Sequence, residues 1–234
     1  MSEFQFKEFT IHQSRSALKV GTDAMMLGSL IHCHLKKNAL DIGAGTGVLS
    51  MMVAQRNSEI LITAIEIDSP SAEDATFNFE NGPFSTRLTC RNEDFLTAQF
   101  EEQFELIFTN PPFYSNTLKT ENSRLNQAKH VESLNPNSLC EKVKNMLSLN
   151  GDFWVIWPFQ FQGEFISSAL EQKLFLKRNI TLEGSPANQV RSVLCFSNSD
   201  QTEIEEKTFV IRDENGQYTD EYRLLTHDYH NRKV

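Results

Sequence analysis

The residues best suited to chemistry lie in one short stretch, residues 106–114, which reads Leu-Ile-Phe-Thr-Asn-Pro-Pro-Phe-Tyr. Its first four residues are mostly apolar and partly β-branched, which predicts the end of a buried strand. Proline lacks an N–H and fixes φ, so Pro111 and Pro112 end the strand and keep the backbone around Asn110 extended. An amide oxygen on a stiff backbone, with an aromatic ring directly behind it, suits the binding of a planar amine such as a nucleobase. Because Asn-Pro also commonly begins a turn, a simple strand-ending turn is the alternative.

A second stretch suited to ligand binding is Asp41-Ile42-Gly43-Ala44-Gly45-Thr46-Gly47. It follows a short apolar strand and precedes an apolar helix that we expect to reach about Arg56. Glycines allow a tight turn and a close approach of a ligand to the backbone. The free N–H groups at the helix N-terminus can bind an acceptor. The third glycine comes one residue too early for the dinucleotide fingerprint, so the loop does not need to hold a pyrophosphate.

Polar residues also end the other predicted strands of this half of the chain. The run 60–67 contains Glu66 and is followed by Asp68, and the short strand 87–91 is followed by Asp94. This order of strand, glycine loop, helix, strand and acid indicates a nucleotide-binding α/β unit, whose ligands bind outside the carboxyl ends of the strands. We therefore expect one crevice lined by the four groups Asp41, Glu66 or Asp68, Asp94 and Asn110. The acid of the second strand could accept hydrogen bonds from both ribose hydroxyls.

The flanking parts of the chain are expected to supply further elements. A short hairpin is predicted within the first 20 residues, followed by a helix capped by Thr22 or Asp23 that extends to about His34. A later helix should start with Ser69 as its cap and Pro70 in its first position. The remaining predicted elements are a polar loop at 114–130, helices at 135–149 and 161–172, a turn at Asn150-Gly151, and strands at 153–157, 175–182, 191–196 and 207–212. The strands 175–182 and 191–196 are expected to pair antiparallel at the sheet edge.

The composition and charge of the chain limit the classes of protein to which it can belong. The chain has 234 residues, 39% of them hydrophobic, and a net charge of −9. This charge argues against a general nucleic-acid-binding surface but leaves room for a local basic patch. We expect a cytoplasmic protein, because no apolar run is long enough for a membrane span and the first residues lack a signal-peptide pattern. The single, scattered cysteines and the histidines show no metal-ligand spacing, so we expect no metal and free thiols.

With these motifs in place, the chain resembles the class I S-adenosylmethionine methyltransferases. Residues 41–47 look like their first motif, and Asn110-Pro111-Pro112-Phe113 looks like the N-P-P-[FY] motif of amino-group methylases. Three flanking stretches extend the resemblance to bacterial enzymes that methylate N6 of adenine 37, 3′ of the anticodon, in tRNA1(Val). These stretches are Val20-Gly21-Thr22-Asp23 with Leu27-Gly28, Arg191-Ser192-Val193-Leu194, and residues 221–226.

The resemblance implies an α/β fold with a seven-stranded, mostly parallel sheet, helices on both faces and an antiparallel edge strand. It implies one methyltransferase domain over 1–234, with residues 1–37 as an N-terminal hairpin and helix extension and 200–234 as a C-terminal edge strand and tail. The implied cofactor is S-adenosylmethionine and the implied partner is tRNA, and we expect a monomer without a membrane partner.

Roles for individual residues follow from the same resemblance. The implied catalytic residues are Asn110, Pro111, Pro112 and Phe113, with Phe113 or Tyr114 stacking on the base. The implied cofactor-binding residues are Asp41, Gly43, Gly45 and Gly47 at the methionine end, Glu66 or Asp68 at the ribose, Asp94 beside Phe95 at the adenine, and Asn110 and Thr22. RNA contacts are assigned to Lys119, Arg124 and Lys129, with further basic candidates at both ends of the chain. Several of these assignments have plain alternatives, because Asp41, Asp68, Thr22 and Asp23 could be helix caps and Asp94 a turn residue.

Two other classes share part of the pattern. Glutamine methylases of release factors and guanine-N2 methylases of ribosomal RNA also carry N-P-P-[FY]. Members of the first typically have an extra N-terminal domain, and some of the second have a duplicated one, for which a glycine loop near residue 41 leaves no room. A non-catalytic nucleotide-binding module would keep the glycine loop but has no reason to keep N-P-P-F.

Overall fold

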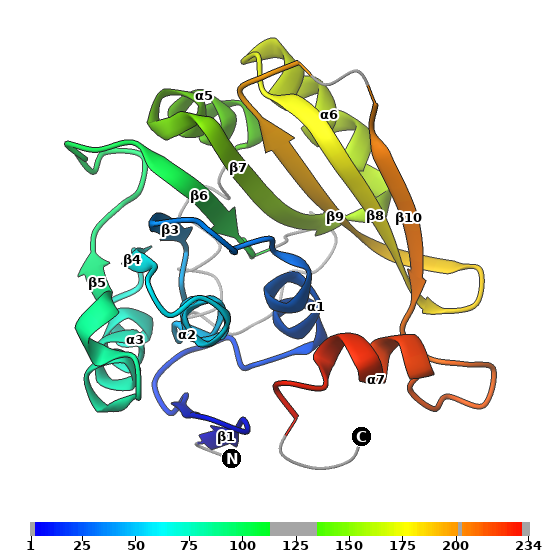
Figure 1. Ribbon diagram of the computed structural model, residues 1–234, viewed down its shortest axis with the longest axis horizontal. Helices are drawn as coiled ribbons and strands as arrows, with labels where there is room; N and C mark the ends of the chain where they lie inside the picture. Colours follow the sequence, from blue (N-terminus) through cyan, green and yellow to red (C-terminus); the bar gives the residue numbers. More distant parts are fainter. Residues whose placement is uncertain (1–2, 113–134, 201–202, 231–234) are drawn as a thin grey trace, which may run out of the picture.

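The computed structural model describes residues 3–112, 135–200 and 203–230, and its centre is one large sheet (Figure 1). The strands of this sheet are β3 (Asn38–Ile42), β4 (Leu61–Glu66), β5 (Leu88–Asn92), β6 (Phe104–Thr109), β7 (Leu147–Pro158), β8 (Phe175–Ser185), β9 (Asn188–Ser197) and β10 (Glu205–Val210). They lie in the order β10-β8-β9-β7-β6-β3-β4-β5. Neighbouring strands are parallel except where β9 pairs with β7 and with β8. The expected α/β fold with a mostly parallel sheet is therefore confirmed.

The far edge of the sheet differs from the expectation in two respects. The sheet has eight strands rather than seven, and its antiparallel strand, β9, lies inside the sheet between β7 and β8. The expected antiparallel pairing of β8 and β9 is present, but β10 adds in parallel to the outer side of β8 and becomes the edge. The resemblance placed an edge strand within residues 200–234, where β10 lies, but a local sequence pattern does not specify that this strand pairs in parallel with β8.

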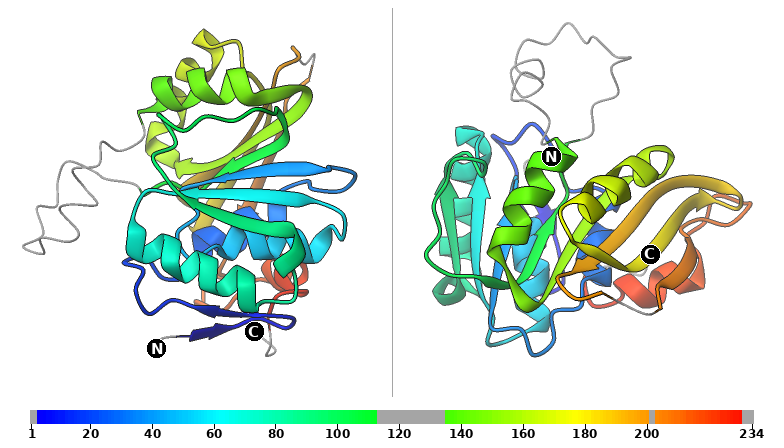
Figure 2. Two further views of the ribbon diagram at one scale, coloured as in Figure 1. Left: turned by 90° about the vertical axis from the view of Figure 1, so that its left-hand side faces the viewer. Right: turned by 90° about the horizontal axis from the view of Figure 1, so that it is seen from above.

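Helices cover both faces of the sheet (Figures 1 and 2). On one face lie α1 (Thr22–Leu30), α2 (Val48–Arg56) and α3 (Ser69–Asn81), and on the other lie α5 (Pro136–Met146) and α6 (Gln162–Glu171). The buried side chains form two apolar layers, and alternate residues of β3 point into opposite layers, Ala39 into the first and Leu40 into the second. Because both faces of the central strands are covered, β3, β4 and β6 are mostly apolar.

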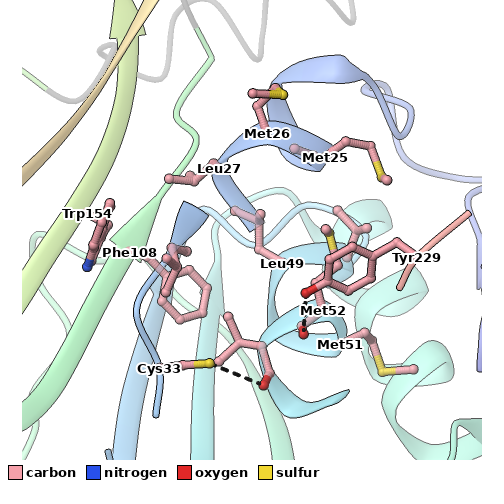
Figure 3. Packing of buried hydrophobic residues seen from close by; sticks show 14 of the residues in the cluster. Met25, Met26, Leu27, Cys33, Leu49, Met51, Met52, Phe108, Trp154 and Tyr229 are labelled. Atoms are coloured by element: carbon pink, nitrogen blue, oxygen red, sulfur yellow. Dashed lines mark hydrogen bonds between the residues drawn. The ribbon is translucent and has the colours of Figure 1, made fainter. Parts of the chain in front are cut away.

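Methionines of α1 and α2 fill much of the first layer (Figure 3). Tyr229, near the end of the described chain, packs against the outer side of this layer. Its buried hydroxyl donates to the Met52 carbonyl at 3.2 Å (Figure 3). The predicted N-terminal hairpin is present as β1 (Glu3–Gln5) and β2 (Thr10–His12). Phe6 forms an isolated bridge with His230, so the two ends of the described chain lie together beside α7 (Asp220–Thr226) (Figure 1).

Several predicted element ends are wrong by a few residues. Helix α1 starts at Thr22 but its N-cap is Gly21, and it ends at Leu30 rather than near His34. Helix α3 is capped by Asp68 instead of Ser69, with Pro70 one place later than expected. The predicted Asn150-Gly151 turn lies within β7, where the pairing with β6 changes register. Among the described residues, we find no helix with the length and hydropathy needed to cross a bilayer.

Candidate active site

The carboxyl ends of β6, β3 and β4 lie in register at one edge of the sheet. Ile42 is the register partner of both Thr109 and Ile65, and the Thr109 hydroxyl donates to the Ile42 carbonyl at 2.8 Å. Neighbouring strands are about 4.8 Å apart, so the strand that leads to Asn110 and the strand that ends at Glu66 are separated by roughly 10 Å. The glycine loop leaves β3 between them. The structure therefore brings these three motifs to the edge at which ligands of such sheets bind.

The glycine loop uses its three glycines in two ways. Gly43, Gly45 and Gly47 have φ of 68°, 56° and 78°, a region that favours glycine. A Cβ at Gly43 or Gly45 would meet no atom within 4 Å, so there is open space beside this backbone. A Cβ at Gly47 would lie 2.4 Å from Cε1 of Phe79, so the third glycine allows α3 to pack closely against the loop.

Asp41 is fully buried just before this loop. Its Oδ2 accepts a hydrogen bond from the Ser50 hydroxyl at 2.7 Å, while Oδ1 has no hydrogen-bond partner among the described residues. Burial raises the pKa of Asp41 to about 7, although the Ser50 hydrogen bonds oppose the rise. A buried acceptor without a donor is costly, and a cationic donor placed beside Oδ1 would remove that cost.

Glu66 and Asp68, the two acids of β4, have different surroundings. Glu66 is buried, with Oε2 accepting from the Gly45 N–H at 2.7 Å and Oε1 from the Asp68 N–H at 2.9 Å. Burial raises the pKa of Glu66, against the effect of these N–H groups. Asp68 instead caps α3, because its Oδ2 accepts from the Ser71 N–H at 3.0 Å and from the Ser71 hydroxyl at 2.6 Å. Of the two candidates for the ribose, Glu66 is therefore the one that contacts the glycine loop.

Asp94 and Thr22 are both accessible to solvent. Asp94 is partly exposed, and its Oδ1 accepts from the Leu96 N–H at 2.9 Å, which is the turn geometry weighed as its alternative. Thr22 is exposed in the first turn of α1, and its side chain does not cap the helix. Asp23 beside it pairs with Arg191 of β9, with Nε 2.9 Å from Oδ2. Neither expected cap role of Thr22 or Asp23 is observed.

The amide of the Asn-Pro-Pro motif lies directly after β6. Asn110 and Pro112 are partly exposed and Pro111 is buried. Five predicted residues lie outside the described part of the chain, namely Phe113, Tyr114, Lys119, Arg124 and Lys129. In the described ranges, no group of three or more histidine, cysteine or acidic side chains could hold a metal ion.

Four polar residues near the site were not predicted from the sequence. Ser50 holds Asp41, and the others, Ser71, Asp74 and Asn78, lie on the buried face of α3. Their spacing of three and four residues places them on one side of the helix. Polar residues at core spacing in a helix are a signal that the sequence offers, because such a position normally holds an apolar side chain.

Comparisons with known proteins agree with this arrangement. Residues 11–179 match the family described as the methyltransferase small domain. A crystal structure of a predicted O-methyltransferase from Agrobacterium tumefaciens has a TM-score of 0.69 and 19% identity, covering 88% of this chain and 96% of that one. A putative class I S-adenosylmethionine-dependent methyltransferase from Listeria monocytogenes has a TM-score of 0.58 and 12% identity, covering 82% of this chain and 68% of that one. At these identities the two structures show the fold, which is that of the class I methyltransferases.

Sequence relatives identify the family to which the chain belongs within this class. A protein of Flavobacterium psychrophilum named tRNA1(Val) (adenine(37)-N6)-methyltransferase is 38% identical over 95% of this chain and 97% of its own length. A protein of the same name from Vibrio campbellii is 31% identical over 97% of this chain and 95% of its own. The chain belongs to the family of tRNA1(Val) (adenine(37)-N6)-methyltransferases, as the motifs had indicated.

S-Adenosylmethionine is the cofactor of this class, and the site fits it. The open space beside Gly43 and Gly45 would admit a ligand, and the unpartnered Oδ1 of Asp41 would accept its ammonium group. Glu66 would hold the ribose, because each of its oxygens can accept a second hydrogen bond.

Proposed function

We propose that this chain methylates N6 of adenine 37, 3′ of the anticodon, in tRNA1(Val), with S-adenosylmethionine as the methyl donor. The observation that carries the proposal is its relationship over nearly the whole chain to enzymes of that name. The site supports it, because Asn110-Pro111-Pro112 lies beside a glycine loop that can admit the cofactor.

Asn110 would act on the nucleophile. The exocyclic amine of adenine is a weak nucleophile because its lone pair is delocalised into the ring. The Asn110 side-chain oxygen and a main-chain carbonyl near Pro111 would each accept one of its N–H bonds, which favours sp³ character and directs the lone pair toward the methyl group. When bound, the cofactor supplies an electrophilic methyl group. The chain needs no strong general base, because the amine becomes acidic once it is methylated, so the rate comes from positioning and electrostatics.

The prolines and the aromatic residues would position the base. Pro111 and Pro112 fix the backbone that presents the Asn110 oxygen. Phe113 or Tyr114 would stack on adenine, a contact worth roughly 1–3 kcal/mol. Bases of an anticodon loop are unpaired, so turning one out costs less than in a duplex. Lys119, Arg124 and Lys129 would contact the phosphates, which gives this acidic chain a local basic region. We further propose a monomer that acts in the cytoplasm, where its tRNA is found.

The test is transfer of a labelled methyl group to defined RNA. We expect label in a tRNA1(Val) transcript and none in the same transcript with guanine at position 37. Total ribosomal RNA and release factor serve as parallel acceptors for the two alternative methylase classes. Label in the guanine-37 transcript, or in either alternative acceptor but not in tRNA1(Val), would contradict the proposal.

A further inference from the structure

Residues 12–20, here called the N-terminal segment, lie against the buried polar residues of α3. They run from the hairpin along α3 toward α1 (Figure 2). Asp74 is fully buried, and its Oδ2 accepts from the N–H groups of Arg15 and Ser16, each at 2.9 Å. Its Oδ1 also receives the Arg15 guanidinium at 3.2 Å. One buried carboxylate thus fixes two consecutive backbone groups of the segment.

Asn78, one helical turn further along α3, joins the N-terminal segment to the glycine loop. Its Oδ1 accepts the His12 N–H at 2.8 Å, and its Nδ2 donates to the His12 carbonyl at 2.8 Å. The same Nδ2 donates to the carbonyl of Thr46, within the glycine loop, at 2.9 Å. Asn78 is 2% exposed, so these bonds are made out of water, where an amide left without partners is costly.

A second chain of hydrogen bonds joins the N-terminal segment to Glu66. The Ser71 hydroxyl contacts the Ser16 hydroxyl at 3.2 Å and donates to Asp68 at 2.6 Å. The Asp68 N–H in turn donates to Glu66, which accepts the Gly45 N–H. The segment and the glycine loop are therefore connected both through Asn78 and through Ser71.

Hydrogen bonds also join the two ends of the segment to each other. The Gln13 side chain accepts the Val20 N–H at 2.9 Å, and the Lys19 ammonium donates to the carbonyls of Gln13 and Ser16. Helix α1 follows at Thr22, and Asp23 in its first turn pairs with Arg191, the register partner of Pro158 at the carboxyl end of β7. The N-terminus of α1 therefore lies at the carboxyl edge of the sheet. The segment thus ends where the strands end.

We propose that the N-terminal segment forms one wall of the cofactor site, and that Asp74 and Asn78 are positioning residues that hold this wall against the glycine loop. This inference rests on the proposed function only in taking S-adenosylmethionine as the ligand. It assigns a binding role to two residues that contact neither cofactor nor substrate. Of the two residues, Asn78 gives the more specific test, because its single side-chain amide is hydrogen-bonded to both the N-terminal segment and the glycine loop.

The test measures binding of S-adenosylhomocysteine without RNA, for the full chain and for Asn78→Ala, Asn78→Asp and Asp74→Asn. Loss of the buried bonds of Asn78 should raise the Kd at least about tenfold, while kcat at saturating cofactor stays within about twofold and the KM for tRNA is unchanged. Asn81→Ala is the matched control, because Asn81 is exposed on the same helix and donates to Phe77 of that helix. Its Kd should equal that of the unchanged chain.

Hydrogen exchange gives a readout that does not depend on a variant folding well. Addition of S-adenosylhomocysteine to the unchanged chain should slow exchange in residues 13–20 together with residues 43–47. A Kd unaffected by Asn78→Ala, or ligand protection of the loop without the segment, would overturn the inference even if tRNA is methylated normally. A tight, Asn78-dependent Kd without methylation of tRNA would support the inference and overturn the proposed function alone. A chain that does not bind the probe at all would overturn both.

Discussion

The carboxylate of Glu66 accepts the backbone N–H of Gly45 at 2.7 Å, which ties the end of β4 to the glycine loop that leaves β3. The acid therefore has a structural partner as well as free acceptor capacity toward a ligand. A carboxylate in this position can hold the loop in place and accept hydroxyl groups of a ribose. The contact therefore couples the position of the glycine loop to that of Glu66.

Replacing Glu66 should consequently affect cofactor binding and stability together. Glu66→Ala leaves the N–H groups of Gly45 and Asp68 without their acceptor, and removes the acceptor for the ribose. Hydrogen bonds to charged groups contribute about 1.5–3 kcal/mol, so we expect the Kd of S-adenosylhomocysteine to rise by about 10- to 100-fold and the Tm to fall, measured by calorimetry. Glu59→Gln, an exposed acid paired with Lys37, is the control and should change neither the Kd nor the Tm appreciably. An unchanged Kd for Glu66→Ala would remove this residue from the binding site.

The raised pKa of Asp41 predicts opposite pH effects on binding and on stability. The carboxyl has a reference pKa of 3.8 and a folded-state pKa of about 7. Between these pH values the folded chain binds more protons than the unfolded chain, so the stability of the unliganded protein should fall as pH rises toward 7. Binding of an ammonium group needs the ionised carboxylate, so the Kd of S-adenosylhomocysteine should fall several-fold between pH 6 and 7.5.

Asp41→Asn separates this effect from that of Glu66, whose pKa is also raised by burial. In this variant the binding of S-adenosylhomocysteine should be weak, and much of its dependence on pH in this range should be lost. Titration calorimetry at several pH values and thermal unfolding of the unliganded chain measure the two effects. A pH-independent Kd in the unchanged chain would show that Asp41 does not receive the ammonium group.

Asn110→Ala should separate catalysis from cofactor binding. The variant lacks the acceptor that would direct the lone pair of the amine, and losses of comparable preorganised polar groups cost about 100- to 1,000-fold in kcat. We expect such a loss in methyl transfer to tRNA1(Val), with a Kd for S-adenosylhomocysteine near that of the unchanged chain. Asn110→Asp keeps acceptor oxygens at the same place and should retain more activity than the alanine variant. Unchanged turnover in Asn110→Ala would refute the assigned role.

Gly47 and Gly216 form a matched pair for the packing of the glycine loop against α3. Both have positive φ, 78° and 75°, but only a Cβ at Gly47 would meet Phe79, at 2.4 Å. Alanine in the left-handed region costs about 1–2 kcal/mol, and overpacking adds about 1–3 kcal/mol. Gly216→Ala should show the first cost and Gly47→Ala both, as measured by urea unfolding. Equal losses would mean that Phe79 moves aside freely.

The local chemistry of this protein was largely readable from its sequence. The residues 41–47 and 110–112, each following an apolar strand, predicted a parallel sheet with polar groups at its carboxyl edge, and the register of β6, β3 and β4 agrees. Such patterns are predictable because prolines and glycines constrain their own backbone and because a buried strand needs an unbroken apolar run. The resemblance to the class I methyltransferases rested on these same short motifs, and three flanking stretches extended it to the tRNA1(Val) enzymes. Both resemblances are confirmed.

The partners of individual side chains were decided by the tertiary structure. The sequence left open whether Glu66 or Asp68 faces the loop, and the fold turns Asp68 to cap α3. The fold also places β10 outside β8, and it brings His12 and Thr46 to the same side-chain amide of Asn78. The pairing of β10 with β8 and the bonds of Asn78 join residues that are far apart along the chain, so no local pattern specifies them. They form because a buried hydrogen-bonding group must find a partner, and only the packed chain determines which partners are within reach.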